Sequence, residues 1–533
     1  MLPEPMLPEF KARQEEARTA AGVTGSEEQC WESPGAITLV SYQSVHFEEY
    51  HSIAKNSISE LTSVLDFHLA NCASLFVNRS VMDTLSKRST PFTASLGPAL
   101  DPCATLLAEK LKIRRRIGYD DGSGSSLLWG VLLGQGHLTS HVAAYGTALG
   151  GGAMPVSERV RNVIQYYRLQ LWHRRVYEPR ISSFRHRYRV DQYGEAPVAC
   201  HLKGQVIITG ADWGLIEPQP LPPSIKLVGP LRAGRGGAEP LPPEVEEHVA
   251  GAPHGVAVIA FPPDYRPPLR ALLAIAEAVL DLKQRIVWQL PAADIARVRQ
   301  VYLPLKHARN VLMLPEVPLE PLMAHRNVVS LISAGSIQTI YTAIYHAKPI
   351  MGVPLTTAQG DLAARYGAGG GLGALGAGQR LSRTELEGGA ASYRVSVAIE
   401  RMSNVYSFTQ SMQQLSTQLR AMLGSQSALE RAAAWVETTT RLDEQGRQYL
   451  TPRSASVGAS TVTGGGGGAL AAGGGGGCMG PMEAANAAAY AVIILTGLAA
   501  VGLVWSVVHI CTRMPPPPKP RAKLIISHKN KDD

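Results

Sequence analysis

The stretch Val328–Leu362 constrains the fold more than any other part of the chain. It opens with an apolar, β-branched run of strand length, Val328–Ile332, followed by the small residues Ser333–Ser336. Apolar residues then recur at the spacing of one face of an amphipathic helix: Ile337, Ile340, Tyr341, Ile344 and Tyr345. Pro349 ends that helix, and Ile350–Leu355 has the composition of a buried strand. The pattern predicts a βαβ unit.

The small residues between the first strand and the helix favour a phosphate site. A tight turn there leaves backbone N–H groups and the positive end of the helix dipole directed at one point. The same pattern is also compatible with an ordinary crossover between parallel strands that binds nothing. Spacing alone leaves both interpretations open.

The stretch resembles the donor-binding signature of the UDP-glycosyltransferases, most closely the membrane-bound glucuronosyltransferase branch. Framework positions match at Ser333, Gly335, Pro349, Pro354 and Gln359. Several residues that contact the nucleotide sugar in that family are replaced. Ala334 stands where the family has a His, and Ser336 where it has a second Gly. Gln338 replaces the phosphate-contacting Asn, Thr342 the acidic ribose contact, and Ala358 the Asp. The resemblance implies binding of a UDP-sugar through Ser333, Gly335, Ser336, Gln338, Gln359 and Asp361.

The resemblance extends over residues 60 to 455 and implies an α/β fold with two facing Rossmann-like domains, the GT-B arrangement. It predicts an N-terminal acceptor-side domain over 36–225, incomplete at its start, and a UDP-sugar-binding domain over 226–455. Residues 1–35 are expected to be disordered or wrongly assigned. Residues 456–486 read as a glycine-rich linker, 487–511 as a transmembrane helix, and 512–533 as a basic cytosolic tail. A chain of 533 residues with 45% hydrophobic content can form two cores.

The implied reaction transfers a sugar from UDP to a small lipophilic acceptor and needs a general base, in this family a His oriented by an Asp. The family's Asp falls on Pro98, and Asp101 lies three positions further along. His46 and Asp101 are therefore only weak catalytic candidates, and His46 also fits an ordinary surface histidine. The replaced residues raise an alternative function: a non-catalytic relative that acts as a membrane-bound partner or scaffold, alone or in an oligomer with related transferases.

No cofactor or metal is expected beyond the UDP-sugar as co-substrate. The six cysteines show no CxxC spacing, so structural zinc is not expected and no disulfide framework is indicated. The net charge of +8 does not point to nucleic acid, because residues 512–533 alone contribute +4 and no basic helix with interleaved aromatics occurs elsewhere.

Membrane attachment is predicted from the C-terminal segment. Ala487–Cys511 is an uncharged run of 25 residues, long enough to cross a hydrocarbon core of about 30 Å. Positive charge follows it, which predicts a cytosolic tail and a luminal main body. Lys529 and Lys531 resemble a dilysine retrieval signal of the endoplasmic reticulum, and Asn78 opens a glycosylation sequon that needs a luminal location. The absence of a signal-peptide pattern at the start conflicts with this and suggests a truncated or wrongly assigned beginning. The alternative is post-translational tail anchoring, which would place the dilysine signal on the wrong side of the membrane.

Overall fold

The computed structural model describes residues 2–3, 41–42, 57–87, 91–133, 139–150, 154–190, 205–211, 215–217, 219, 221–231, 233–234, 240–262, 267–366, 376–424 and 426–442. All of them belong to one compact unit, residues 1–452; residues 453–533 form the second. The predicted linker, membrane span and tail lie outside the described residues. Strand β2 (Ser41–Tyr42) pairs in parallel with β1 (Leu2–Pro3). Within the described residues no helix has the length and apolar character needed to span a bilayer.

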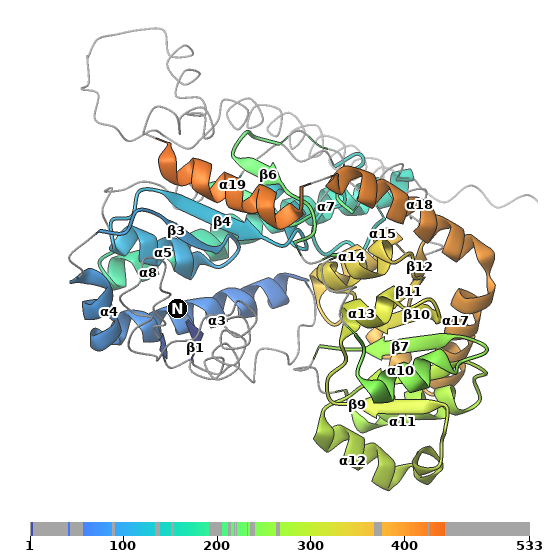
Figure 1. Cartoon of the computed structure of the whole chain (residues 1–533). Coiled ribbons are helices and arrows are strands. Elements are labelled where there is room, and N and C mark those ends of the chain that lie inside the picture. Colours follow the sequence, from blue (N-terminus) through green and yellow to red (C-terminus); the bar gives the residue numbers. More distant parts are fainter. Residues whose placement is uncertain are drawn as a thin grey trace, which may run out of the picture. The chain divides into compact units, whose positions relative to one another are not determined.

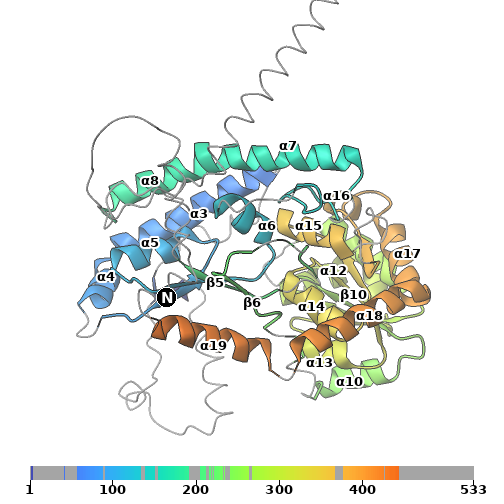
Figure 2. The same cartoon turned by 90° about the horizontal axis from the view of Figure 1, so that it is seen from above.

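The N-terminal half is built on a parallel sheet of four strands in the order β3-β4-β5-β6. Their bounds are Ser95–Pro98 for β3, Arg116–Asp120 for β4, Val206–Thr209 for β5 and Ile225–Leu227 for β6. Helix α19 (Ala428–Arg441) returns from the end of the described chain and covers one face, where Ala432 packs with Ile117 and Ile208. Figure 2 shows α19 and the pair α7 and α8 on opposite sides of β5 and β6.

Helices of the N-terminal half fill the other face of this sheet. They are α3 (Ser57–Val77), α4 (Arg79–Ser86), α5 (Pro102–Lys110), α6 (Ser125–Leu127), α7 (Val156–Trp172) and α8 (Glu178–Arg187), with π-helical turns η3 (Leu128–Leu132) and η4 (His173–Tyr177). Residues 120–152 are rich in Gly and Ser, a composition typical of a loop. Residues 125–132 are helical because Leu127, Leu128 and Trp129 are buried in the core, which outweighs the surrounding Gly and Ser.

A disulfide joins Cys72 of α3 to Cys103 of α5. The cysteine spacing gave no indication of a disulfide, and the structure corrects this. Spacing could not reveal the bond because its two cysteines lie on different helices that meet only in the folded chain. The bond ties α3 to the start of α5, and Cys72 itself is fully buried.

The second half is a six-stranded parallel sheet in the order β9-β8-β7-β10-β11-β12. Its strands are β7 (Val256–Ala260), β8 (Arg285–Gln289), β9 (Val311–Leu314), β10 (Val328–Ser333), β11 (Ile350–Gly352) and β12 (Gly378–Arg380). Counted from β7, the order is 3-2-1-4-5-6, the doubly wound order of dinucleotide-binding folds. In Figure 1 these strands and the N-terminal strands form separate sheets. The βαβ unit predicted around Ser333–Ser336 is confirmed.

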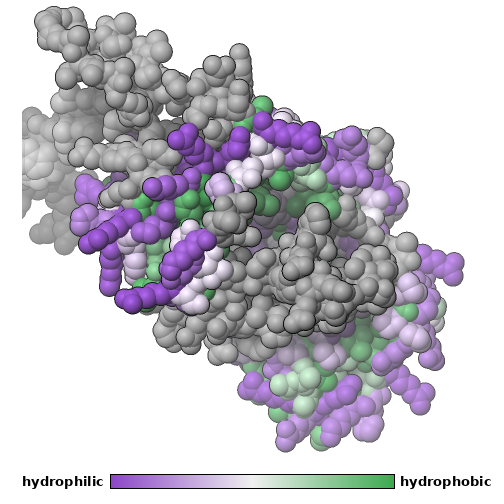
Figure 3. All heavy atoms as spheres, turned by 60° about the vertical axis from the view of Figure 1, so that its left-hand side comes forward, coloured by the Kyte–Doolittle hydropathy of each residue, from purple (hydrophilic) through white to green (hydrophobic). Residues whose placement is uncertain are grey.

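Helices flank this second sheet on both faces. They are α10 (Pro243–Ala250), α11 (Leu269–Leu280), α12 (Ala292–Val301), α13 (Leu319–Ala324), α14 (Ile337–Tyr345), α15 (Thr357–Tyr366), α16 (Arg383–Leu386), α17 (Ala391–Asn404) and α18 (Tyr406–Leu423), with the 3₁₀ turn η5 (Leu303–Lys306). The central strands β7 and β10 are almost entirely buried because both of their faces are covered. Hydrophilic residues dominate the coloured surface of the face in Figure 3, with hydrophobic residues between them.

Candidate active site

The turn Ser333–Ser336, here called the donor loop, lies at the carboxyl end of β10. Strands β7 and β10 are neighbours at the point where the strand order reverses, and open parallel sheets bind ligands at that point. Gly335 has φ +76°, a left-handed conformation that glycine adopts without steric cost. Its N–H donates to the buried Ser333 Oγ over 3.0 Å, which fixes the turn.

Ser336 is the N-cap of α14 and holds the first turn of that helix in place. Its Oγ accepts the Thr339 N–H over 3.3 Å and lies 2.7 Å from Thr339 Oγ1. The two serine hydroxyls predicted to contact phosphate therefore shape the loop. What the loop can present to an anion is the backbone and the positive end of α14.

The first two turns of α14 carry the positions that correspond to family nucleotide contacts. Gln338 has a buried Oε1 without a hydrogen-bond partner in the described part of the chain. Thr342 donates its hydroxyl to Glu320 Oε2 over 2.8 Å, and Glu320 Oε1 also contacts His346 Nε2 at 3.0 Å. Burial alone would raise the pKa of Glu320, but hydrogen bonds from His346 and Thr342 hold it below its usual value. Helix α13 thus supplies a carboxylate beside the position where the family has an acidic ribose contact.

Gln359 and Asp361, the other two predicted sugar contacts, make contacts within the protein. Gln359 Oε1 accepts the N–H groups of Leu355 and Thr356 over 2.8 and 3.1 Å and so caps the start of α15. Asp361 is 6% exposed and accepts the N–H groups of Gly146 and Ala148 over 2.7 and 2.8 Å. Burial raises the pKa of Asp361 to about 6, against the opposing effect of those two amides.

Helix α15 is also fastened to the N-terminal half at two further points. The Glu60 carboxylate accepts the Thr357 N–H over 3.0 Å and the Thr357 hydroxyl. Arg365 donates to the Leu215 carbonyl and pairs with Glu217 over 2.9 Å. The segment predicted to bind the sugar therefore also connects the two halves, which the sequence gave no means of detecting.

Asp101, a weak catalytic candidate, is the N-cap of α5 and accepts the Cys103 N–H over 2.9 Å. The same oxygen lies 3.4 Å from Nδ1 of His68 on α3. His46 lies outside the described residues. Sequence reasoning missed His68, since nothing in its local pattern distinguishes it from other polar residues of α3.

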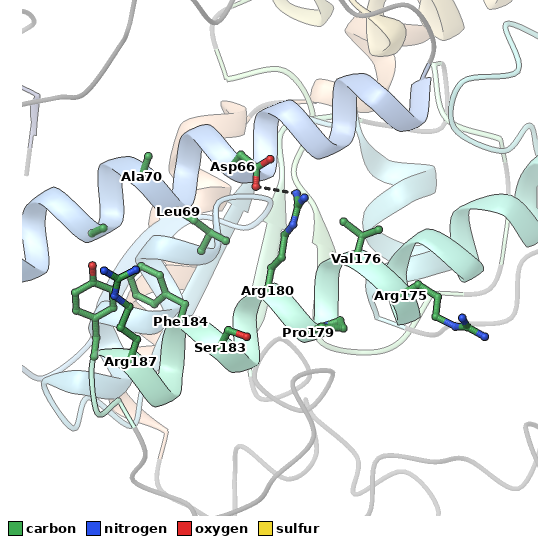
Figure 4. A pocket seen from close by; sticks show the side chains of 12 residues that line it. Asp66, Leu69, Ala70, Arg175, Val176, Pro179, Arg180, Ser183, Phe184 and Arg187 are labelled. Carbon is green, nitrogen blue, oxygen red and sulfur yellow. Dashed lines mark hydrogen bonds and ion pairs between the residues drawn. The ribbon is translucent and has the colours of Figure 1, made fainter.

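A groove of about 520 Å³ lies between α3 and the continuous helix formed by η4 and α8. Figure 4 shows Leu69 and Phe184 in it, with Arg180 paired to Asp66 across it. Its lining residues are Asp66, Leu69, Ala70, Ala73, Arg175, Val176, Pro179, Arg180, Ser183, Phe184, Arg187 and Tyr188. None of them belongs to the donor loop, so this groove is separate from the candidate donor site.

The structure also bears on the predicted glycosylation site and on metal binding. Asn78 is the N-cap of α4 and accepts the Val81 N–H through Oδ1 over 3.2 Å, so its amide nitrogen, the atom that N-glycosylation modifies, is not part of this bond. Among the residues that the structure describes, no three His, Cys, Asp or Glu side chains gather in a way that could hold a metal ion.

The family model described as UDP-glucoronosyl and UDP-glucosyl transferase matches residues 32–454. UDP-glucuronosyltransferase 2B17 of Mus musculus is 26% identical over 324 residues, 58% of this chain and 56% of that protein. UDP-glucuronosyltransferase 2B1 of Rattus norvegicus is 26% identical over 332 residues, 60% and 57% of the two chains. The chain thus spans little more than half the length of these relatives.

Among solved structures, a UDP-glucosyltransferase from Polygonum tinctorium, described as capable of glucosylating indoxyl and crystallised with 3,4-dichloroaniline, superposes with a TM-score of 0.50 at 15% identity. The match covers 79% of this chain and 91% of that one. This likeness supports a GT-B-like fold with parallel sheets. Because the family model covers most of the sequence, this chain belongs to the UDP-glucoronosyl and UDP-glucosyl transferase family.

Proposed function

We propose that the chain is a UDP-glycosyltransferase that moves a sugar from a UDP-sugar to a small lipophilic acceptor. The observation that carries the proposal is the donor loop. It joins the central strand β10 to a helix N-terminus at the switch point of a doubly wound sheet. The donor loop would hold the diphosphate through backbone N–H groups and the α14 dipole, and so stabilise UDP as it leaves.

A second candidate function is a non-catalytic, membrane-bound partner of related transferases. Two observations favour it. Gln359 and Asp361 are engaged within the protein, and residues that contact the nucleotide sugar elsewhere in the family are replaced here. Loss of one oriented donor costs about 10²–10³ in rate, so several such losses together could abolish turnover.

UDP binding tests the donor site, and sugar transfer separates the two candidate functions. The purified membrane-anchored protein is heated with and without millimolar UDP, with uridine as the ligand that lacks phosphate. A donor site predicts a higher melting temperature with UDP and a much smaller effect of uridine. Sugar transfer from UDP-glucuronic acid or UDP-glucose to 4-methylumbelliferone then tests turnover. Binding without transfer supports the non-catalytic function; no UDP shift contradicts the donor site.

A matched pair of variants links the shift to the donor loop. Gly335→Ala puts a side chain at φ +76°, a conformation that costs about 1–2 kcal/mol for a residue other than glycine, and should reduce the UDP effect. Gly389→Ala is the control, because a Cβ there meets open space. If UDP raises the melting temperature of Gly335→Ala as much as that of wild type, the donor loop does not bind the nucleotide.

We further propose a single-pass protein of the endoplasmic reticulum membrane whose main body is luminal. The Cys72–Cys103 disulfide supports this, because disulfides persist in oxidising compartments. A row of apolar residues along the outer face of α7 also supports it: Val156, Val160, Ile164 and Leu171 are 52–69% exposed. The exposed Arg159, Arg161 and Arg168 lie beside that row. Such a face fits an anionic lipid surface.

A further inference from the structure

Two neighbouring strands of the N-terminal sheet end in polar residues that are completely buried. Asp120 is the last residue of β4 and Thr209 the last residue of β5, and the two are register partners in the parallel pair. Register partners place their side chains on the same face of a sheet. Asp120 is 3% exposed and Thr209 is 0% exposed. A carboxylate and a hydroxyl thus lie side by side in the interior.

Neither side chain has a well-formed hydrogen bond within the described ranges. Oγ1 of Thr209 and both carboxylate oxygens of Asp120 lack a partner of good geometry, and the Gly122 amide is a weak hydrogen-bond donor to the Asp120 carboxylate. Leaving a buried polar group unpaired costs about 1–3 kcal/mol, and more for a charged one. Folded proteins rarely retain such groups without a reason, and an incoming ligand is one such reason.

The pair lies next to the candidate donor site. A Cβ built on Gly122, two residues after Asp120, would lie 3.1 Å from Cδ1 of Ile337. Ile337 is the first residue of α14 and directly follows the donor loop. Gln338, the next residue, also carries a buried oxygen, Oε1, without a partner in the described chain. The end of β4 and the first turn of α14 therefore meet where parallel strands present their carboxyl ends.

The chemistry of these groups selects the ligand. A carboxylate and an amide oxygen accept hydrogen bonds, and a threonine hydroxyl can do the same. Together they suit a molecule that brings O–H donors, such as an alcohol or phenol. Burial and the neighbouring Asp121 raise the pKa of Asp120 to about 7, with the Gly122 amide opposing. A general base works best when its pKa lies near the working pH.

We propose that Asp120 is the general base of this chain and binds the acceptor hydroxyl together with Thr209. The inference rests on the proposed transferase function. In the step, the acceptor O–H proton passes to the Asp120 carboxylate as the acceptor oxygen bonds to the anomeric carbon. The bond from that carbon to the diphosphate breaks, and UDP, held by the donor loop, leaves with the bonding electrons. His68 beside Asp101 is the competing base.

The first experiment measures transfer to 4-methylumbelliferone across pH 5 to 9 in wild type, Asp120→Asn and His68→Gln. Asp83→Asn, an exposed change on α4 that removes the same charge, is the control. Asp120→Asn should lower kcat/KM by about 10²–10⁴-fold and abolish the rise of activity around pH 7. Asp121→Asn should keep the maximal rate but move that rise to lower pH, since the Asp121 charge raises the pKa of Asp120. The assignment of Asp120 is wrong if Asp120→Asn keeps the rise of activity around pH 7, or if only His68→Gln loses that rise.

The second experiment does not need turnover. The fluorescence excitation of bound 4-methylumbelliferone distinguishes phenol from phenolate, so binding and proton transfer are both read with and without UDP. Wild type should bind the phenol with an affinity that changes around pH 7, and Asp120→Asn should bind it at least tenfold more weakly without that pH dependence. Equal binding by both proteins overturns the inference. A protein that passes this test but shows no UDP shift refutes the proposed transferase and keeps Asp120 as a phenol site.

Discussion

The Cys72–Cys103 disulfide gives a prediction whose size can be worked out from the structure. The bond closes a loop with a sequence separation of 31 residues. The chain-entropy relation for that loop length gives a stabilisation of about 4 kcal/mol at 25 °C. At about 1.4 kcal/mol per factor of ten, breaking the bond should raise the opening equilibrium of the segment by several hundredfold.

Hydrogen exchange of α3 is the direct measurement, because its slowest amides report the opening free energy of that unit. The amides of Leu65 and Leu75 should exchange several hundredfold faster in the Cys72→Ala/Cys103→Ala double variant. Wild type treated with a reductant should show the same faster exchange. Reduced wild type keeps both cysteine side chains, so this comparison separates the loss of the cross-link from the cavity that the alanine substitutions create. The reductant should not affect the double variant.

The same bond has a functional consequence. Cys72 lies one turn after His68 on α3, and Cys103 lies in the first turn of α5, which Asp101 caps. Loss of the disulfide should therefore loosen the His68–Asp101 pair as well. If exchange of α3 in the reduced protein stays within threefold of the oxidised protein, the disulfide does not hold this segment and the loop-entropy reasoning fails.

Three further predictions follow from single positions. Asn78→Gln should remove one glycan and abolish an endoglycosidase H-sensitive mobility shift in membranes of expressing cells; an unchanged shift contradicts use of this sequon. Asp120→Asn should stabilise the protein above pH 7. Folding raises the pKa of Asp120 from 3.8 to about 7, so the free energy of unfolding of wild type falls by up to about 4 kcal/mol as the pH rises from 3.8 to 7. The uncharged amide of the variant does not lose this stability. Denaturant unfolding at pH 5 and pH 8 checks this, and equal curves at pH 8 contradict it. Val160→Glu with Ile164→Glu should weaken binding of the protein to phosphatidylserine vesicles in a flotation assay, whereas Ser157→Glu beside them tests charge alone.

The βαβ unit that contains the donor loop was predictable from sequence because its two strands are short apolar runs and Pro349 separates its helix from the second strand. The predicted strand Val328–Ile332 lies within β10, and the predicted strand Ile350–Leu355 begins with β11. The boundary between the closing helices was not predictable: α17 ends at Asn404 and α18 begins at Tyr406. Val405 between them adopts an extended conformation, which periodicity does not reveal.

The N-terminal half and the site depended on contacts that no local pattern encodes. Residues 125–132 looked like part of a loop because Gly and Ser surround them, yet burial made them helical. The Glu60–Thr357 contact joins residues 297 positions apart in the chain. The pairing of Asp120 with Thr209 depends on strand register. Register is set by packing of the whole sheet, so the sequence alone could not bring these two residues together.

In the candidate site the backbone and the side chains have different roles. The donor loop depends on a strand end, one glycine with positive φ and a helix N-terminus, and those features persist when individual side chains change. Carboxylates lie near two of the positions under discussion: Glu320 accepts the Thr342 hydroxyl, and Asp120 ends β4 close to the first turn of α14. A backbone phosphate site tolerates such exchange because its donors are fixed by the fold. A chain that had lost selection for ligand binding would have no reason to keep the poorly paired buried oxygens of Asp120, Thr209 and Gln338 where the end of β4 meets α14, since each costs stability. That cost favours a retained ligand.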